Sequence, residues 1–423
     1  MKGATIATIP MVLLVLFSTL GRAGDTGVLD YRFEESSAIS WFPVNYLDTR
    51  SAALGNISLF SSGAGAQLYN PAQRSGRDQF SLAVTGEYIR YQAFQYWGVN
   101  QGALAQPAPR EEDLFEFGAL LVNLPLGQWE AAAGFGLSGL LSFPDFQIRQ
   151  NYIYDQYYRI QGQFEGRDRT WFLALARQIT PDLVAGARLE ATIGYRRVSY
   201  SELDSYYFWE PSLNQYVLKN IGLSRLEDHT RRFFRLALGS LYQASDRWRL
   251  GIIFRIPLGG YSDREITQSF ANDYDEIHIT IGGTGRDPLT EPWSMALATT
   301  MDIRLLGSTL KVGLEGEMLL AGDYEYQVLG ERMPRETGNG MALKFGLEYP
   351  LELAGRIHFL RLGYRLENQP LETPSVQLHV FSGGIGISLW KLNLDMGMAL
   401  YRTSGLDYPQ QHLTAGTTLW FGL

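Results

Sequence analysis

The stretch Leu310-Lys311-Val312-Gly313-Leu314-Glu315-Gly316-Glu317-Met318 has apolar residues or glycine at even positions and charged residues or glycine at odd positions. A period of two is that of a β-strand, in which successive side chains point to opposite faces. One face of this strand suits lipid, and the other carries full charges. A closed barrel with lipid outside and water inside needs this pattern.

The same alternation recurs in three later segments, 343–349, 360–367 and 391–400. Soluble sheets also alternate, but here the polar face carries full charges on strand after strand. The pattern therefore predicts an all-β fold, a transmembrane antiparallel β-barrel.

Candidate strands follow one another from residue 79 to the last residue. Their bounds are 79–97, 111–124, 128–143, 165–179, 182–200, 231–244, 247–265, 291–306, 308–328, 338–351, 354–368, 376–389, 391–403 and 409–423. This gives about fourteen strands, and single-chain bacterial barrels have an even number.

The connections between these strands alternate in length. Tight turns are predicted near Gly127, Pro181, Asp246 and Gly307. Long loops are predicted at 98–110, 144–164, 201–230, 266–290, 329–337, 369–375 and 404–408. Short turns on one side and long loops on the other are typical of outer-membrane barrels.

The N-terminus reads as an export signal. Lys2 precedes an apolar stretch, and Gly21-Arg22-Ala23 offers small residues at a cleavage site. Residues 1–23 are therefore predicted to be a cleavable signal peptide, and a membrane anchor is the alternative. Residues 24–78 show little alternation. They are predicted to form an irregular segment that packs against the rest of the protein and does not span the membrane. Residues 79–423 are predicted to form the barrel.

Composition limits the possible functions. The chain has 423 residues and no cysteine, which excludes disulfides, thiol chemistry and a lipid anchor on cysteine. Its net charge of -8 argues against a nucleic-acid partner. Aromatic residues make up 13%, which suits two interfacial girdles. The mean hydropathy of -0.12 averages lipid-facing and water-facing residues.

The sequence gives little support for a catalytic, metal or cofactor site. None of the five histidines pairs at metal-ligand spacing. His379 and Ser382 are three residues apart, which puts them on opposite faces of a strand and argues against a catalytic pair. Residues 111–113 are acidic and read as a solvated strand start or a divalent-ion contact. The sequence predicts no enzyme, no metal and no cofactor.

Many charged residues of the predicted strands would face the lumen. They are Arg188, Glu190, Arg235, Arg304, Lys311, Glu315, Glu317, Lys344, Glu348, Arg361, Arg365, Glu367, Lys391 and Asp395. Their mixed signs predict neutralising ion pairs and a plugged lumen rather than a wide pore. Arg188, Arg361 and Arg365 are candidate partners for a ligand carboxylate.

Three stretches resemble the FadL/TodX-type outer-membrane transporters of long-chain fatty acids and other hydrophobic compounds. Residues 49–55 (TRSAALG) and Leu68-Tyr69-Asn70-Pro71-Ala72 are similar to the family's N-terminal hatch. Residues 361–370 and 379–401 resemble late strands of the family. In two respects the hatch departs from the family pattern. Gly55-Asn56 stands where the family has Gly-Gly, and 61–67 lacks the acidic pair usual before Asn-Pro-Ala.

The resemblance implies a mechanism. A hydrophobic ligand would dock among the aromatic loop residues Tyr206, Tyr207, Phe208 and Trp209 and enter a pocket above the hatch. The hatch turn Asn70-Pro71-Ala72 would then move and release the ligand through a gap in the wall. Such a route avoids a water-filled pore, in which apolar surface would stay wet. The location implied is the bacterial outer membrane.

Three alternatives remain at this stage. A related branch of barrels shares the hatch and serves as scaffold or shuttle subunits in protein secretion, with protein partners at the extracellular loops. A general porin for small polar solutes and an enzyme barrel are the other two. The sequence identifies neither the ligand nor the oligomeric state.

Overall fold

The computed structural model describes most of the chain from Thr49 onward. The described residues are 49–61, 65–74, 80–94, 109–152, 156–272, 277–289, 292–305, 307–320, 325–328, 331–334, 339–353, 356–368, 377–389, 392–404 and 411–422. At some strand positions only the backbone is described. The chain divides into Met1–Glu35 and Ser36–Leu423, and all described residues belong to the second unit. The predicted signal peptide lies outside them.

Among the described residues, two short helices precede the strands, α2 (Thr49–Ala53) and α3 (Ala66–Tyr69). Within the described residues, no helix has the length and apolar character needed to cross a membrane.

Seventeen strands follow in the part of the chain that the structure describes. They are β1 (Ser81–Phe94), β2 (Pro109–Leu126), β3 (Trp129–Tyr152), β4 (Gln156–Thr180), β5 (Leu183–Glu210), β6 (Gln215–Ser245), β7 (Trp248–Asn272), β8 (Ile277–Leu289), β9 (Trp293–Leu305), β10 (Ser308–Leu320), β11 (Glu325–Val328), β12 (Glu331–Pro334), β13 (Gly340–Leu353), β14 (Arg356–Asn368), β15 (Gln377–Leu389), β16 (Leu392–Ser404) and β17 (Gln411–Gly422).

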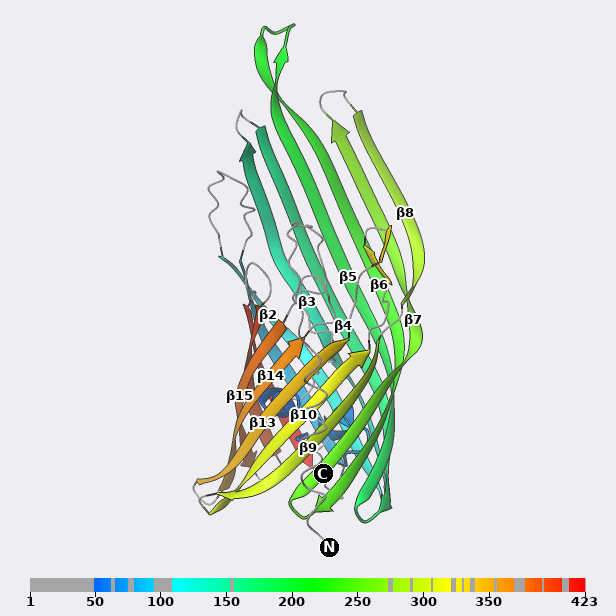
Figure 1. The fold of residues 1–423 in the computed structure, drawn as a ribbon, viewed down its shortest axis with the longest axis vertical. Coiled ribbons are helices and arrows are strands. Elements are labelled where there is room, and N and C mark those ends of the chain that lie inside the picture. The colour runs from blue at the N-terminus through cyan, green and yellow to red at the C-terminus, as the bar shows by residue number, and fades with distance from the viewer. Residues whose placement is uncertain are drawn as a thin grey trace. The chain divides into compact units, whose positions relative to one another are not determined.

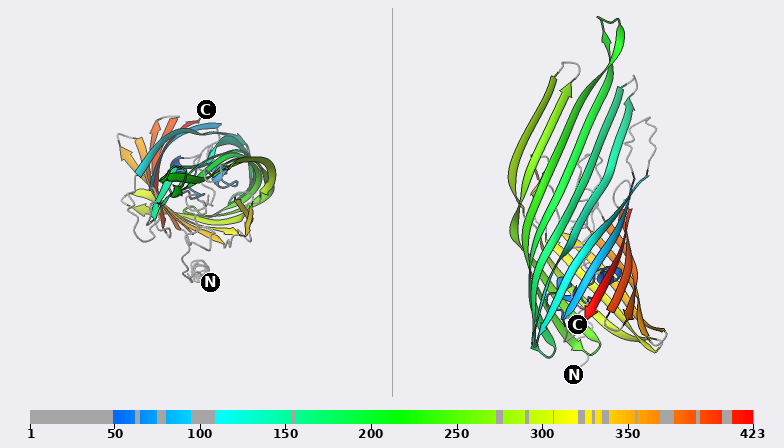
Figure 2. Two further views of the ribbon diagram at one scale, coloured as in Figure 1. Left: turned by 90° about the horizontal axis from the view of Figure 1, so that it is seen from above. Right: turned by 180° about the vertical axis from the view of Figure 1, so that it is seen from behind.

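The main sheet closes on itself into an antiparallel barrel (Figures 1 and 2). β1 pairs with both β2 and β17, and β6 pairs with both β5 and β7. β8 pairs with the upper half of β7, and β9 pairs with its lower half. β8 and β9 thus share one place in the wall, and the barrel has 14 strand positions, which confirms the predicted fold class.

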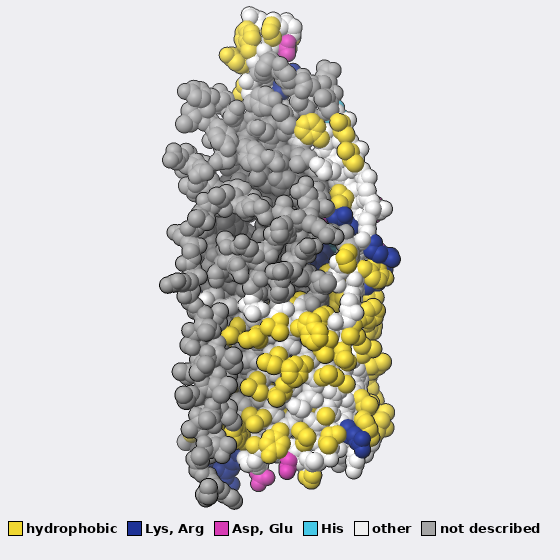
Figure 3. Space-filling view, turned by 45° about the vertical axis from the view of Figure 1, so that its right-hand side comes forward, with side chains coloured by type: hydrophobic (Ala, Val, Ile, Leu, Met, Phe, Trp, Pro, Cys, Tyr) yellow, Lys and Arg dark blue, Asp and Glu magenta, His cyan; other side chains and the backbone are white. Residues whose placement is uncertain are grey.

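The outer face of the lower barrel is apolar. On β9, Trp293, Met295 and Leu297 are exposed, whereas Ser294 and Ala296 between them are buried. The same alternation on neighbouring strands builds a continuous belt of apolar side chains (Figure 3). Strands of 13 residues, such as β9 and β14, suit a bilayer, since about 9–11 tilted residues span its core.

Five strands are far longer than a bilayer requires. β5 has 28 residues and β6 has 31, and β3, β4 and β7 have 24 or 25. The upper parts of β3–β7, together with β8, form a tall wall beside the short strands (Figure 1). We call this tall wall the half-shell.

The prediction of long loops at 144–164, 201–230 and 266–290 is therefore wrong, because most of these residues belong to β3–β8. The prediction of one strand over 308–328 is also wrong. β10 ends at Leu320, and β11 pairs with β12 in a separate small sheet.

The wall splits between β2 and β3. Their ladder runs from Leu126 opposite Trp129 to Ala119 opposite Gly136. Beyond this point β2 pairs with β1 and β3 pairs with β4, with no described pairing between β2 and β3. A register shift on β2 skips Gly118 at the same level, and such bulges bend a strand.

Candidate functional site

The hatch lies inside the lower barrel. We use this name for its described residues, 49–61 and 65–74. Nearly all of them are buried, including Leu54, Ile57, Phe60 and Leu68. Burying one such side chain contributes about 1.5–3 kcal/mol. The lumen is therefore plugged at this level.

A tight turn follows α2. Gly55 and Asn56 have φ values of 71° and 59°, both in the left-handed region. Asparagine tolerates this region better than most residues. Asn56 therefore suits a left-handed position at which the family that the sequence resembles has glycine. The Gly55 N–H donates to Ser382 Oγ at 3.3 Å.

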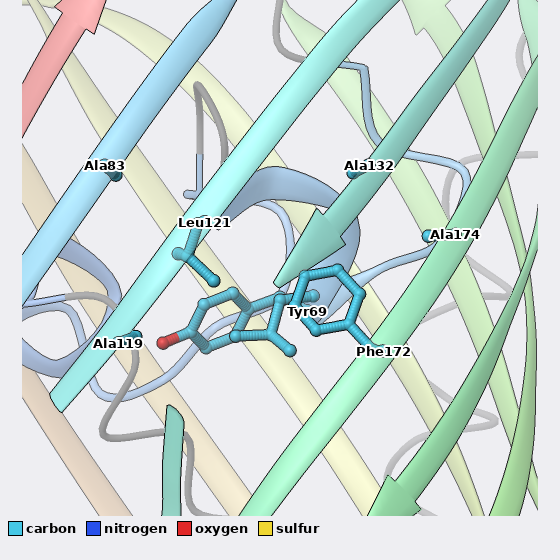
Figure 4. Close-up of a cluster of buried hydrophobic side chains, with 8 residues drawn as sticks. Tyr69, Ala83, Ala119, Leu121, Ala132, Phe172 and Ala174 are labelled. Atoms are coloured by element: carbon cyan, nitrogen blue, oxygen red, sulfur yellow. The ribbon is translucent and has the colours of Figure 1, made fainter. Parts of the chain in front are cut away.

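An apolar seat on β1–β4 receives α3. Leu68 and Tyr69 pack against small residues and Phe172, as Figure 4 shows for Tyr69. The wall residues of this seat are Ala83, Ala119, Leu121, Ala132, Phe172 and Ala174. Alanines leave the room that the Tyr69 ring occupies.

The Asn-Pro-Ala turn faces β5–β7. The Ala72 N–H donates to Asn70 Oδ1 at 2.9 Å, and the Gln73 N–H donates to the Asn70 carbonyl at 2.9 Å. The Asn70 side chain also donates to the Ser240 carbonyl of β6 at 3.3 Å. One residue thus shapes the turn and ties it to the wall.

Glycines on the wall surround the hatch. A Cβ atom added to any of them would come within 3.0 Å of a hatch atom. We call this set the glycine belt; its members are Gly186, Gly239, Gly251, Gly313, Gly346, Gly363, Gly384, Gly397 and Gly416. Each lies on a different strand, from β5 round to β17. The belt lets wall and hatch backbones approach closely.

A chain of ions joins the hatch to β13–β16. Arg50 of the hatch pairs with Glu348 at 2.7 Å, and Glu348 pairs with Arg361 at 2.9 Å. Arg361 also pairs with Asp395 at 2.5 Å. Apart from Arg50, which is half-buried, these groups are buried, so each charge depends on its partner.

A second cluster lies on β7, β10 and β13. Lys344 donates to Glu315 and to Glu317, each at 2.7 Å, and Arg255 pairs with Glu317. Glu315 in turn accepts the backbone N–H of Ser58 at 2.6 Å. The hatch backbone is therefore held by a wall carboxylate.

A third cluster holds α3, just before the Asn-Pro-Ala turn. Arg188 donates to the Gln67 carbonyl at 2.8 Å and to Glu190 at 2.7 Å. Glu190 also pairs with Arg235 at 3.1 Å, and the Gln67 side chain donates to Glu130. Neutralising pairs were predicted from the mixed signs, and these three clusters confirm them.

One predicted lumen charge lies at the rim of the barrel. Arg304 shares the β9 face of buried Ala298 and Thr300, and it is exposed because it lies at the strand end beside the turn at Gly307. Lys391 lies outside the described residues. Arg365 is buried and pairs with Glu367 at 2.9 Å. Because Arg188, Arg361 and Arg365 already contact wall carboxylates, their role in ligand binding stays a prediction.

The predicted loop aromatics lie on β5 instead of a loop. Tyr207 and Trp209 are exposed, and Trp209 meets Tyr216 of β6 edge to face with ring centroids 5.1 Å apart. They share the strand face of outward Leu189 and Ile193, because the β5–β6 register is unbroken. The side chains of Tyr206 and Phe208 are outside the described set. Ligand docking by these four residues stays a prediction.

Buried apolar side chains line the lumen face of β15 and β16. They are Leu378, Val380, Ala399 and Tyr401. Directly across the ladder from Val380 lies Arg365, whose guanidinium is 5.9 Å from the Tyr401 ring centroid. An apolar surface thus borders a charged one.

The candidate catalytic pair is separated by the wall. Ser382 is buried and contacts the hatch, whereas His379 is hydrogen-bonded to Tyr364 at 2.9 Å on the opposite strand face. In the described part of the chain, no group of three or more His, Asp or Glu side chains is placed to hold a metal ion. The acidic side chains of 111–113 are outside the described set.

Sequence reasoning missed several hatch contacts. Arg50, Gln67 and Arg74 were not singled out, although Arg74 donates to Gln178 at 2.9 Å and to the Gly127 carbonyl at 3.1 Å. The glycine belt left a signal: Gly313 and Gly346 occupy charged-face positions of the alternation. Glycine at such a position indicates that another part of the backbone approaches the strand closely.

Solved structures share this architecture. A Pseudomonas aeruginosa FadL homologue matches with a TM-score of 0.60 at 12% identity, covering 91% of this chain and 99% of that chain. The P. putida toluene transporter TodX matches at 0.60 and 14%, covering 89% and 98%. The Ralstonia pickettii toluene transporter TbuX matches at 0.56 and 12%, covering 89% and 98%.

The chain has the FadL-type barrel fold. No protein-family model and no curated protein matches its sequence. The structural likeness spans about nine-tenths of the chain, including the middle region that the sequence resemblance did not cover. At these identities it establishes the fold, and the resemblance stated from the sequence is confirmed at that level.

Proposed function

We propose that this FadL-type barrel transports hydrophobic small molecules, long-chain fatty acids or hydrocarbons, across the bacterial outer membrane. The observation that carries the proposal is the hatch, which fills the lower lumen and is seated on the glycine belt. A plug of this kind suits a solute that crosses in steps through a bound site. It does not suit the free diffusion of polar solutes through a general porin.

The proposed route uses the wall. Ligand enters from the side of the half-shell, contacts the apolar face of β15 and β16, and leaves through the split between β2 and β3. An apolar ligand leaving there meets lipid directly, so its surface is never exposed to water. The proteins with this fold named above as toluene transporters support a hydrophobic substrate class.

The hatch turn is the place to test the proposal. In the double variant Asn70→Ala/Pro71→Ala, the bonds from Asn70 to Ala72 and to Ser240 are lost. We expect the barrel to fold, shown by heat-modifiable migration, and uptake of radiolabelled oleate or toluene by cells to fall at least several-fold. Normal uptake by the double variant contradicts the hatch role.

A matched control uses the same two substitutions elsewhere. Pro211 and Asn214 lie in the exposed turn between β5 and β6. Pro211→Ala/Asn214→Ala removes one proline and one asparagine from a turn that does not contact the hatch. We expect uptake by this variant to stay within about twofold of the parent, since exposed turns tolerate substitution.

A second candidate function, a partner barrel for another protein, rests on the half-shell. In the described part of the chain, β8 pairs with β7 alone, so its other edge offers backbone groups to an added strand. Ile279 and Ile281 on this strand are exposed. The two functions need different parts of the wall: transport needs the hatch and the split, and partner binding needs the half-shell.

A further inference from the structure

An arginine-rich band lies along the upper limit of the apolar belt. On β5 the outward residues change from Leu189 and Ile193 to Tyr195 and Arg197. On β6 the outward residue above Phe234 is Arg232. Figure 3 shows Lys and Arg side chains gathered at the upper edge of the apolar surface. This is the level at which lipid headgroups meet a barrel.

One part of this band is a cluster on β6, β7 and β8. Asp263 binds two arginines: Arg232 Nη1 donates to its Oδ2 at 2.7 Å, and Arg286 Nε donates to its Oδ1 at 2.6 Å. Both guanidiniums contact the same ring, lying 5.3 Å and 4.5 Å from the Tyr261 centroid. We call Arg232, Tyr261, Asp263 and Arg286 the arginine clamp.

The clamp keeps a positive charge on the surface. Two guanidiniums share one carboxylate, which leaves a net charge of about +1. The side chain of Arg286 is 65% exposed, and that of Arg232 is 38% exposed. Within the described residues, the Nη groups of Arg286 donate to no acceptor, since its one bond is made through Nε. Donors in a planar fork therefore face solvent.

These features fit a lipid phosphate. Arginine forks bind phosphate oxygens in pairs, and the Tyr261 ring and Asp263 hold both forks in place before a ligand arrives. The clamp also continues directly into the apolar belt, through exposed Phe234 and Leu258 below it. A ligand that places acyl chains on the belt and phosphate at the clamp satisfies both surfaces.

We propose that the arginine clamp is a binding site for the phosphate headgroup of an anionic membrane lipid. The site lies on the outer surface of the barrel and takes no part in the proposed transport route. It would fix the height of the barrel in its leaflet, because it joins the apolar belt to charge at one level.

Binding is tested with matched lipids. The full-length protein in detergent micelles is titrated with dioleoylphosphatidic acid, and bound lipid is counted by native mass spectrometry. Dioleoylglycerol, which has the same acyl chains without phosphate, is the lipid control. We expect saturable binding of the phosphatidic acid, binding of the glycerol lipid at least tenfold weaker, and no displacement by 10 mM inorganic phosphate.

Variants locate the site. Arg232→Gln/Arg286→Gln should weaken phosphatidic acid binding about tenfold or more. Arg177→Gln/Arg247→Gln removes the same charge at the opposite rim, where Arg177 lies 4.9 Å from the Trp129 ring centroid and Arg247 is in the turn before β7. It should change binding less than twofold. Heat-modifiable migration checks that both variants fold.

Three results overturn the proposal. Equal weakening in both double variants assigns binding to net charge alone. Equal binding of the lipids with and without phosphate assigns it to the acyl chains. Displacement by inorganic phosphate assigns the clamp to a soluble anion.

Discussion

Gly363 shows how closely the hatch and the wall approach at a single residue. A Cβ atom there would lie 2.2 Å from the Gly55 nitrogen and 2.4 Å from Ser382 Oγ. Both neighbours are fixed, the first by the left-handed turn and the second by its strand. To relieve this clash, the hatch backbone would have to shift.

Gly363→Ala is expected to destabilise the protein by about 1–3 kcal/mol, the usual cost of overpacking. It should also make the hatch more accessible to protease. Gly316→Ala is the matched control on β10, because nothing lies within 4 Å of its added Cβ. Urea unfolding from micelles and timed proteolysis measure both effects. Equal stability of the two variants would contradict a tight hatch seat.

For single residues, the sequence was informative where a residue type has one main structural role. The alternation correctly placed Lys344, Glu348 and Arg361 inside the barrel, because an unpaired charge in lipid is too costly. It did not reveal their partners. Arg50 reaches Glu348 from nearly 300 positions away in sequence, and strand periodicity holds no information on which hatch residue meets which strand.

Among the elements, the long strands were the largest error of sequence interpretation. The alternation fades above the bilayer because both faces of β5 and β6 then meet polar surroundings, and a pattern of burial no longer marks a strand. The backbone pairing continues nevertheless, from Tyr195 opposite Thr230 to Glu210 opposite Gln215. This part of β5 is roughly 50 Å long at about 3.3 Å per residue.

The tip of this hairpin is a two-stranded ribbon. β4 pairs with β5 only as far as Ser205, and β7 pairs with β6 only as far as Ile221. Residues 206–219, which we call the ribbon, therefore pair only with one another in the described structure. The pair Ser205 and Asn220 lies directly next to the ribbon in the β5–β6 ladder. It exposes Tyr207, Trp209, Leu213, Tyr216 and Leu218.

Replacing residues 206–219 by Asn-Gly should leave the barrel intact, because Ser205 and Asn220 are already opposite each other and Asn-Gly closes a tight hairpin. We expect heat-modifiable migration to be unchanged and uptake of oleate or toluene to fall several-fold, because the predicted docking residues Tyr206, Tyr207, Phe208 and Trp209 are removed. Uptake and cross-linking to other envelope proteins are measured in the same cells.

The two readouts separate the possible roles of the ribbon. Lost uptake would assign ligand docking to Tyr206, Tyr207, Phe208 and Trp209. Retained uptake together with a lost cross-linked partner would favour the partner-barrel function. A variant that fails to fold would show that the ribbon is needed for the wall itself.

Over the whole molecule, the barrel class was predictable and its asymmetry was not. Periodicity identifies strands and their lipid face, and an even strand count follows from closure. The shared position of β8 and β9 and the split between β2 and β3 depend on which strands pair at each height. Such pairing is set by contacts across the whole wall, which no local pattern reports.

The hatch in the lower lumen and the split in the upper wall lie next to each other. The described hatch residues contact wall residues on strands from β1 to β17. The split lies just above the seat of Tyr69, since Ala119 is both the last β2 residue paired with β3 and a member of that seat. A ligand resting on the hatch therefore lies beside the opening.

Closing the split with a cross-link should block transport. The chain has no cysteine, so Phe117→Cys/Ser138→Cys places a unique pair just beyond the end of the β2–β3 ladder, and a flexible bismaleimide then joins the strands. In the control, Val122→Cys/Ala133→Cys, the same reagent joins two residues already opposite each other in that ladder. We expect cross-linking to reduce uptake of oleate or toluene at least several-fold in the first variant and to leave it nearly unchanged in the second. Full uptake through a closed split would place the exit elsewhere, and the hatch would then have to open downward against the contacts of the glycine belt.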